Sequence, residues 1–167
     1  GVTDMENMTG KVWILGDDID TDIIIPTEYL AMKTIDDMKQ YAFSPLRPEL
    51  AGLIQKGDII VAGKNFGCGS SREQAPEIIK ALGIQCVIAK SFARIFFRNA
   101  FNNGLLLIEQ PDLYDDIKEG DTITVHMNKH VDYNGKEYPI AALPENLMRI
   151  IQAGGLVGAM RKLNGLD

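Results

Sequence analysis

One short segment, residues 65–74 (N-F-G-C-G-S-S-R-E-Q), brings together the residue types that could do chemistry. Its two glycines allow the backbone to turn tightly and to approach a ligand closely. Ser70 and Ser71 follow where a helix is expected to begin, and a helix start offers free N–H groups and positive potential to an anion. Arg72 adds a planar guanidinium that can bind a carboxylate through two hydrogen bonds. The segment therefore predicts a cradle for a carboxylate or a phosphate.

The same residues also have a purely structural interpretation. Glu73 and Gln74 stand at capping-box spacing from the two serines, so Ser70 could merely cap the helix while Arg72 lies in solvent. Residues 64–98 carry six basic and two acidic residues, a local charge of +4, in a chain whose net charge is −6. This basic island suits a small anionic ligand, or it is a solvated helix face.

Other catalytic and metal-binding motifs have the wrong spacing or are missing. The segment lacks the third glycine of a dinucleotide-binding fingerprint and the lysine of a P-loop. His126 and His130 fall in an expected hairpin, so they are interpreted as exposed strand residues and a Ser-His-Asp hydrolase is disfavoured. The alternating aspartates of residues 18–22 lack the glycine and glutamate of a calcium loop. Cys68 and Cys86 are too few for an iron–sulfur cluster. We expect no metal or cofactor on this chain itself.

Composition narrows the class of protein. The chain has 167 residues, 46% of them hydrophobic, which indicates one domain over residues 1–167, with residues 1–10 as a flexible N-terminal end. The acidic net charge argues against nucleic acid or an anionic membrane as partners. The sequence has no apolar run long enough to span a bilayer and no secretory signal at its start. With only two cysteines, a reducing, cytoplasmic setting is expected.

The elements that must position the cradle alternate along the chain. Buried strands are expected at 11–15, 59–62, 86–89 and 105–108, and helices at 34–43, 48–54, 71–82 and 92–102. An antiparallel hairpin region follows at 121–127, 130–133 and 136–140, and helical residues run from 144 to 163 with a break at two glycines. This order predicts an α/β fold with a mixed sheet flanked by helices and an antiparallel β appendage.

Three segments occur in an order and spacing that resemble a known family. They are residues 17–26 (D-D-I-D-T-D-I-I-I-P), residues 65–74 and residues 89–94 (A-K-S-F-A-R). Together they resemble the small subunits of 3-isopropylmalate dehydratase and homoaconitase, the free-standing form of the aconitase swivel domain. The resemblance extends from about residue 11 to residue 163 and implies a swivelling β/β/α domain.

The resemblance also implies an activity and a partner. Family enzymes are hydro-lyases that move a hydroxyl group between adjacent carbons of a small dicarboxylate, and a separate large subunit holds their 4Fe–4S cluster. The resemblance implies that Ser70 removes the proton and that Ser71 and Arg72 contact the substrate carboxylate. It aligns Asp20 with an active-site aspartate of aconitases.

The loop at residues 29–32 (Y-L-A-M) is implied to select the substrate. Relatives whose substrate has an extra carboxylate carry an arginine there, whereas Ala31 and Met32 supply no cation. An apolar substituent such as isopropyl is therefore expected, which points to the isomerisation of isopropylmalate in leucine biosynthesis. The alternatives are homoaconitase, a hydratase of methyl-substituted malate or maleate, and a non-catalytic module that binds a dicarboxylate or a phosphate.

Overall fold

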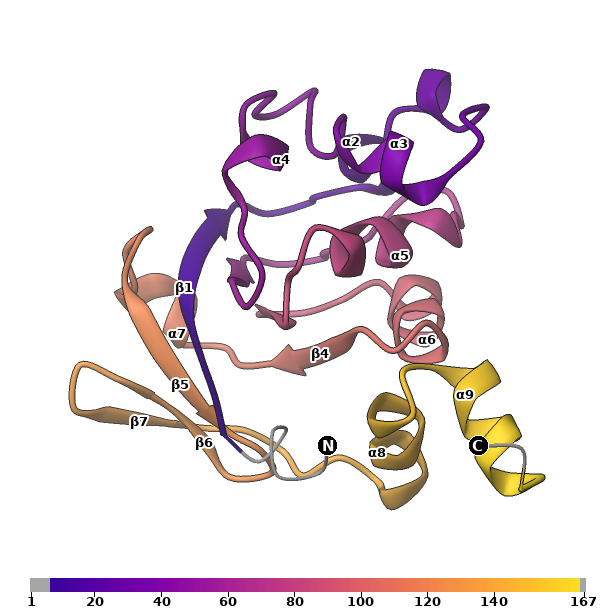
Figure 1. Ribbon diagram of the computed structural model, residues 1–167. Helices are drawn as coiled ribbons and strands as arrows, with labels where there is room; N and C mark the ends of the chain where they lie inside the picture. The colour runs from indigo at the N-terminus through magenta and orange to yellow at the C-terminus, as the bar shows by residue number, and fades with distance from the viewer. Residues whose placement is uncertain (1–6, 166–167) are drawn as a thin grey trace.

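The computed structural model describes residues 7–165, and its centre is one seven-stranded mixed sheet with the strand order β4-β3-β2-β1-β5-β6-β7. Strands β1 (Asn7–Leu15), β2 (Ile59–Ala62), β3 (Cys86–Ala89) and β4 (Leu106–Glu109) are parallel. All side chains of β2 and β3 are buried. Helices α5 (Gln74–Ala81) and α6 (Arg94–Asn102) connect these strands and lie beside them (Figure 1). This parallel half confirms the expected α/β pattern.

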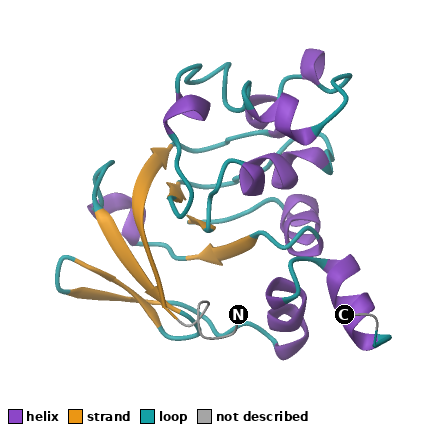
Figure 2. Cartoon of the chain, viewed as in Figure 1, coloured by secondary structure: helices purple, strands orange, loops and turns teal. Residues whose placement is uncertain are grey.

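The antiparallel half is the expected β appendage, and it continues the same sheet. Strands β5 (Thr122–His126), β6 (His130–Tyr133) and β7 (Lys136–Pro139) follow one another as a meander (Figure 2). Strand β1 joins the halves, because residues 12–15 pair with β2 and residues 7–11 pair with β5. Residues 7–10 were expected in a flexible end, and this expectation is wrong for them. The rest of that end, residues 1–6, lies outside the described residues.

The remaining helices are short and surround the sheet. They are α2 (Thr21–Ile24), the 3-10 helix η1 (Thr27–Tyr29), α3 (Ile35–Lys39), α4 (Leu50–Leu53), α7 (Leu113–Asp116), α8 (Glu145–Gln152) and α9 (Leu156–Leu163). The helices expected at 34–43 and 48–54 are shorter in the structure, where they correspond to α3 and α4. The chain between α3 and α4 consists mainly of turns. Within residues 7–165, none of the helices has the length and apolar character needed to cross a membrane.

Candidate active site at the carboxyl edge of the parallel strands

The three sequence segments meet in space, each directly after a parallel strand. Because β1, β2 and β3 are adjacent and parallel, their carboxyl ends lie at one edge of the sheet, where α/β proteins commonly bind ligands. The Gly67 N–H donates to the Ile19 carbonyl oxygen at 2.7 Å, and the Phe66 N–H donates to the Ser91 carbonyl oxygen at 3.1 Å. Main-chain hydrogen bonds thus join the loop after β2 to the loops on both sides.

Helix α2 holds the serine-bearing loop in place. The Thr21 N–H donates to the Cys68 carbonyl oxygen at 2.9 Å, and the Thr21 hydroxyl donates to the Ser70 carbonyl oxygen at 2.7 Å. Asp20 is the N-cap of α2, and its Oδ1 accepts from the Ile23 N–H at 2.9 Å. Asp20 therefore positions α2, and α2 in turn positions Ser70.

A cavity of about 300 Å³ opens between this loop and the start of α6. Gly67 forms part of its wall with a φ of +84°, and a Cβ atom there would overlap the ring of Phe96. The lining residues are Thr21, Gly67, Gly69, Ser70, Ser71, Arg72, Ala93, Arg94, Ile95, Phe96 and Asn99. A cavity lined by three hydroxyl residues and two arginines is suited to a small anion.

The two serines do not cap a helix. Helix α5 begins at Gln74 with Glu73 as its N-cap and without a side-chain capping bond. The expected helix start at residue 71 and the capping box are therefore wrong. Ser70 and Ser71 are instead exposed in the loop before the helix, where both line the cavity.

Arg72 is largely buried and is bound to the segment that follows α2. Its Nη1 donates to the Ile25 carbonyl oxygen at 2.7 Å, and its Nη2 donates to the Thr27 hydroxyl at 2.8 Å. The Asp22 carboxylate, 64% exposed, forms an ion pair with the same Nη2. The guanidinium thus binds the Asp22 carboxylate on its solvent side and anchors residues 25–27.

Two further polar residues, Arg94 and Asn99, line the cavity but were not assigned to the candidate site from the sequence. Arg94 begins α6 and is exposed, and the Asn99 side-chain amide donates to the Ser71 hydroxyl at 3.5 Å. Arg94 belongs to the A-K-S-F-A-R motif and to the basic island. Together these two features could have identified it as a site residue. Other lysines of that island have structural roles, since Lys80 donates to main-chain carbonyl oxygens and Lys90 pairs with Asp115.

The other residues singled out from the sequence lie around the cavity. Ala31 is exposed and Met32 is packed against the core, and both follow η1 outside the cavity lining. Cys68 lies on the serine loop, where burial and then the carboxylates of Asp20 and Asp18 raise the pKa of its thiol. At neutral pH Cys68 is therefore a thiol and not a nucleophilic thiolate.

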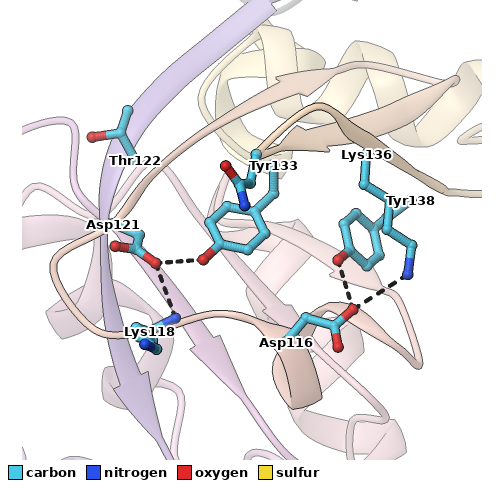
Figure 3. Close-up of a pocket in the computed structure, with 8 residues that line it drawn as sticks. Asp116, Lys118, Asp121, Thr122, Tyr133, Lys136 and Tyr138 are labelled. Carbon is cyan, nitrogen blue, oxygen red and sulfur yellow. Dashed lines mark hydrogen bonds and ion pairs between the residues drawn. The ribbon is translucent and has the colours of Figure 1, made fainter.

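A larger cavity, of about 730 Å³, lies beside the antiparallel strands. Polar side chains of its lining are hydrogen-bonded to one another. Figure 3 shows the Tyr133 hydroxyl directed at Asp121 and the Tyr138 hydroxyl directed at Asp116, with hydrogen bonds of 2.5 Å and 2.6 Å. Burial and the Asp116 carboxylate raise the pKa of Tyr138 to about 12. These neutral tyrosines act as donors to structural carboxylates, so the cavity at the carboxyl edge remains the candidate active site.

Comparison with known proteins places this geometry in a family. The family model for the aconitase C-terminal domain matches residues 23–113. The 3-isopropylmalate dehydratase small subunit of Lachnospira eligens is 76% identical over 97% of this chain and 99% of its own length. The 3-isopropylmalate dehydratase small subunit 1 of Archaeoglobus fulgidus is 51% identical over 92% of this chain and 97% of its own length.

A solved structure agrees over nearly the whole length. The 3-isopropylmalate dehydratase structure from Methanocaldococcus jannaschii superposes with a TM-score of 0.90 and 39% identity, and the match covers 96% of each chain. The fold expected from the sequence is thereby confirmed. The chain belongs to the family of 3-isopropylmalate dehydratase small subunits, and its fold is that of the aconitase C-terminal domain.

Proposed function

We propose that this chain is the small subunit of a hydro-lyase that interconverts 2-isopropylmalate and 3-isopropylmalate by dehydration and rehydration. The observation that carries the proposal is the cavity in which Ser70, Ser71 and Arg72 converge at the carboxyl edge of the parallel strands. The names of the relatives supply the substrate, and the cavity supplies groups that match a small dicarboxylate.

Within the cavity, Ser70 is proposed as the base that removes a proton from the carbon beside a carboxylate. A serine hydroxyl is a weak base, so its anion needs nearby donors in a site without bulk water. Arg72 and Arg94 supply positive charge, and Ser71 supplies a hydroxyl. We assign Ser71 and Arg72 to the substrate carboxylate, with Asp20 holding the loop through α2.

A separate large subunit is required by this proposal for two reasons. Ser70 and Ser71 are exposed in the isolated chain, so another surface must cover them before the cavity can exclude water. Cys86 is buried in β3 and Cys68 lies on the serine loop, and two thiols do not match the ligand set of a 4Fe–4S cluster. A cluster on the large subunit would supply a Lewis acid for the departing hydroxyl group.

Reconstitution tests the proposal directly. We expect the purified chain and the large subunit encoded in the same genome to be inactive alone, and their anaerobic mixture to hydrate 2-isopropylmaleate, the dehydrated intermediate. The formation of both isopropylmalates is measured chromatographically. A mixture that forms a complex and binds the diacid without turnover would identify the chain as a binding module instead.

Substrate selection is proposed to depend on Ala31 and Met32. Their turn is joined to the cavity through Thr27, which accepts a hydrogen bond from Arg72. The ring of Tyr29 stacks on Tyr41 with centroids 4.0 Å apart, which fixes the start of the turn. The exposed Ala31 methyl group is proposed to face a substituent of the substrate once a partner closes the cavity.

Introducing a charge at this turn is expected to change the preferred substrate. Ala31→Arg should lower kcat/KM for isopropylmalate by about 30-fold, because an unpaired guanidinium beside an alkyl group costs about 2 kcal/mol. It should raise kcat/KM for homoaconitate, whose extra carboxylate can pair with the arginine. Steady-state kinetics on both substrates checks this, with Ala31→Met as the control of similar length without charge. An unchanged ratio of the two kcat/KM values would show that residue 31 does not contact the substituent.

A further inference from the structure

The only two histidines of the chain face each other across a hairpin far from the candidate active site. His126 ends β5 and His130 begins β6, and the two are directly paired in the antiparallel register. Their ring centroids are 4.8 Å apart. His126 also pairs with Asn7 at the start of β1, whereas the cavity follows the other end of that strand. A nine-residue strand spans roughly 25 Å, so the two places are well separated.

Strand alternation puts two carboxylates on the same face as these imidazoles. Val125 and Val131 are fully buried and occupy the core face of the hairpin. Because side chains alternate, the residues on either side of them point to the opposite face. Asp132 on β6 is directly paired with Glu137 on β7, so both carboxylates lie beside the imidazole of His130.

The four side chains are already in contact. The His126 Nε2 lies 2.6 Å from Oδ2 of Asp132, and the His130 Nε2 lies 3.0 Å from its Oδ1. The His130 Nε2 is also 3.2 Å from Oε2 of Glu137. One ligand atom from each of His126, His130 and Asp132 lies within 4.8 Å of the others. Tetrahedral ligands at about 2.0–2.2 Å from a zinc ion are separated by about 3.4 Å, so small side-chain rotations suffice.

The charges of this group favour a divalent cation at its centre. Directly opposed like charges such as Asp132 and Glu137 destabilise a strand pair when nothing compensates them. The Asp132 and Glu137 carboxylates carry two negative charges, which one divalent ion neutralises. All four remain partly accessible, with side chains between 24% and 67% exposed, so an ion can enter from solvent.

We propose that His126, His130 and Asp132 form a binding site for a divalent transition-metal ion, with Glu137 as the nearest additional ligand. Two imidazole nitrogens with carboxylate oxygens suit Zn²⁺, Co²⁺ and Ni²⁺ rather than the oxygen-only sites of Mg²⁺ and Ca²⁺. A bound ion would cross-link the three strands of the meander, because its ligands come from β5, β6 and β7. The site is independent of the proposed dehydratase activity, because it shares no residue with the cavity.

Zinc titration of the purified chain tests the site. We expect one Zn²⁺ per chain in calorimetry against a weak chelator, and an increase in Tm of about 5 to 10 °C at 100 times the Kd. His126→Ala and His130→Ala should each weaken Zn²⁺ binding by at least the ~10–100-fold that follows loss of an outer-shell partner. The double variant should lose both the binding and the Tm increase. Lys129→Ala, in the turn between the histidines, serves as the matched control and should bind like the wild type.

Two further measurements distinguish this site from zinc binding at a cysteine or between two chains. Far-UV circular dichroism and the metal-free Tm show whether each variant is folded, and Asp132→Asn provides a milder substitution on the same face. With Co²⁺ as the probe, visible absorption typical of nitrogen and oxygen ligands is expected, without a thiolate charge-transfer band. The proposal fails if Cys68→Ser rather than the histidine variants removes binding, if the double histidine variant binds as tightly as the wild type, or if zinc binds only as one ion between two chains.

Discussion

Ser70→Ala is expected to lower kcat of the reconstituted enzyme by about 10²–10⁴-fold, the usual contribution of a positioned general base. The folded chain should be almost unaffected, because the bond from Thr21 uses the Ser70 carbonyl oxygen, which alanine retains. Since Ser70 is exposed and does not cap α5, the free energy of unfolding of the chain should change by less than about 0.5 kcal/mol. Single-turnover kinetics and thermal unfolding of the same preparation provide the two measurements.

Comparison with the other serines makes this result specific. Ser71→Ala should mainly raise KM, because we assign that hydroxyl to substrate binding. Ser44→Ala, in the turns after α3 and outside the cavity, should retain full activity. If Ser70→Ala loses only about tenfold in kcat, another group removes the proton and the assignment of Ser70 is wrong.

The strands with wholly local signals were predicted closely. Residues 59–62 and 86–89 are short apolar runs that begin after turn residues, and they form β2 and β3 with the expected bounds. The Asn134-Gly135 pair correctly predicted the turn between β6 and β7, where both residues have positive φ. Turn chemistry and burial on both faces are properties of neighbouring residues, so a single sequence reveals them.

Elements that depend on distant partners were predicted less well. Residues 7–10 extend β1 because β5, more than 100 residues later, pairs with them. Ser70 stays out of α5 because Thr21 binds the carbonyl oxygens of Cys68 and Ser70 and holds that loop in place. Neither partner is visible in the local pattern. The predicted strand at 11–15 was therefore too short, and the predicted helix at 71–82 was too long.

The candidate site was predicted in part for the same reason. Ser70, Ser71 and Arg72 adjoin in sequence, and all three line one cavity. Arg94 and Asn99 reach that cavity only because α6 packs beside the serine loop, where the Phe66 and Phe96 rings meet with centroids 5.5 Å apart. The catalytic roles themselves stay predictions, and they depend most strongly on Ser70 and Arg72.

Arg72→Lys is expected to lower kcat/KM of the reconstituted enzyme by about 100-fold, although the charge is conserved. The guanidinium reaches the Ile25 carbonyl oxygen and the Thr27 hydroxyl with separate nitrogens, and it faces a carboxylate on its exposed side. A lysine ammonium is a single point and cannot hold all three partners. Losing one charged hydrogen bond to the proposed substrate carboxylate costs about 1.5–3 kcal/mol, and the upper end of this range corresponds to the expected factor.

The way this loss divides between kinetic parameters tests the role of Arg72. If the guanidinium binds a substrate carboxylate, Arg72→Lys should raise KM and weaken inhibition by unreactive dicarboxylates, while a monoester of the same inhibitor loses less. Arg98→Lys, an exposed arginine of α6 outside the cavity, is the matched control and should leave kcat/KM unchanged. Equal losses for the dicarboxylate and the monoester would instead mean that Arg72 only anchors residues 25–27. In that case the carboxylate partner in the cavity would have to be Arg94, the remaining cation of its lining.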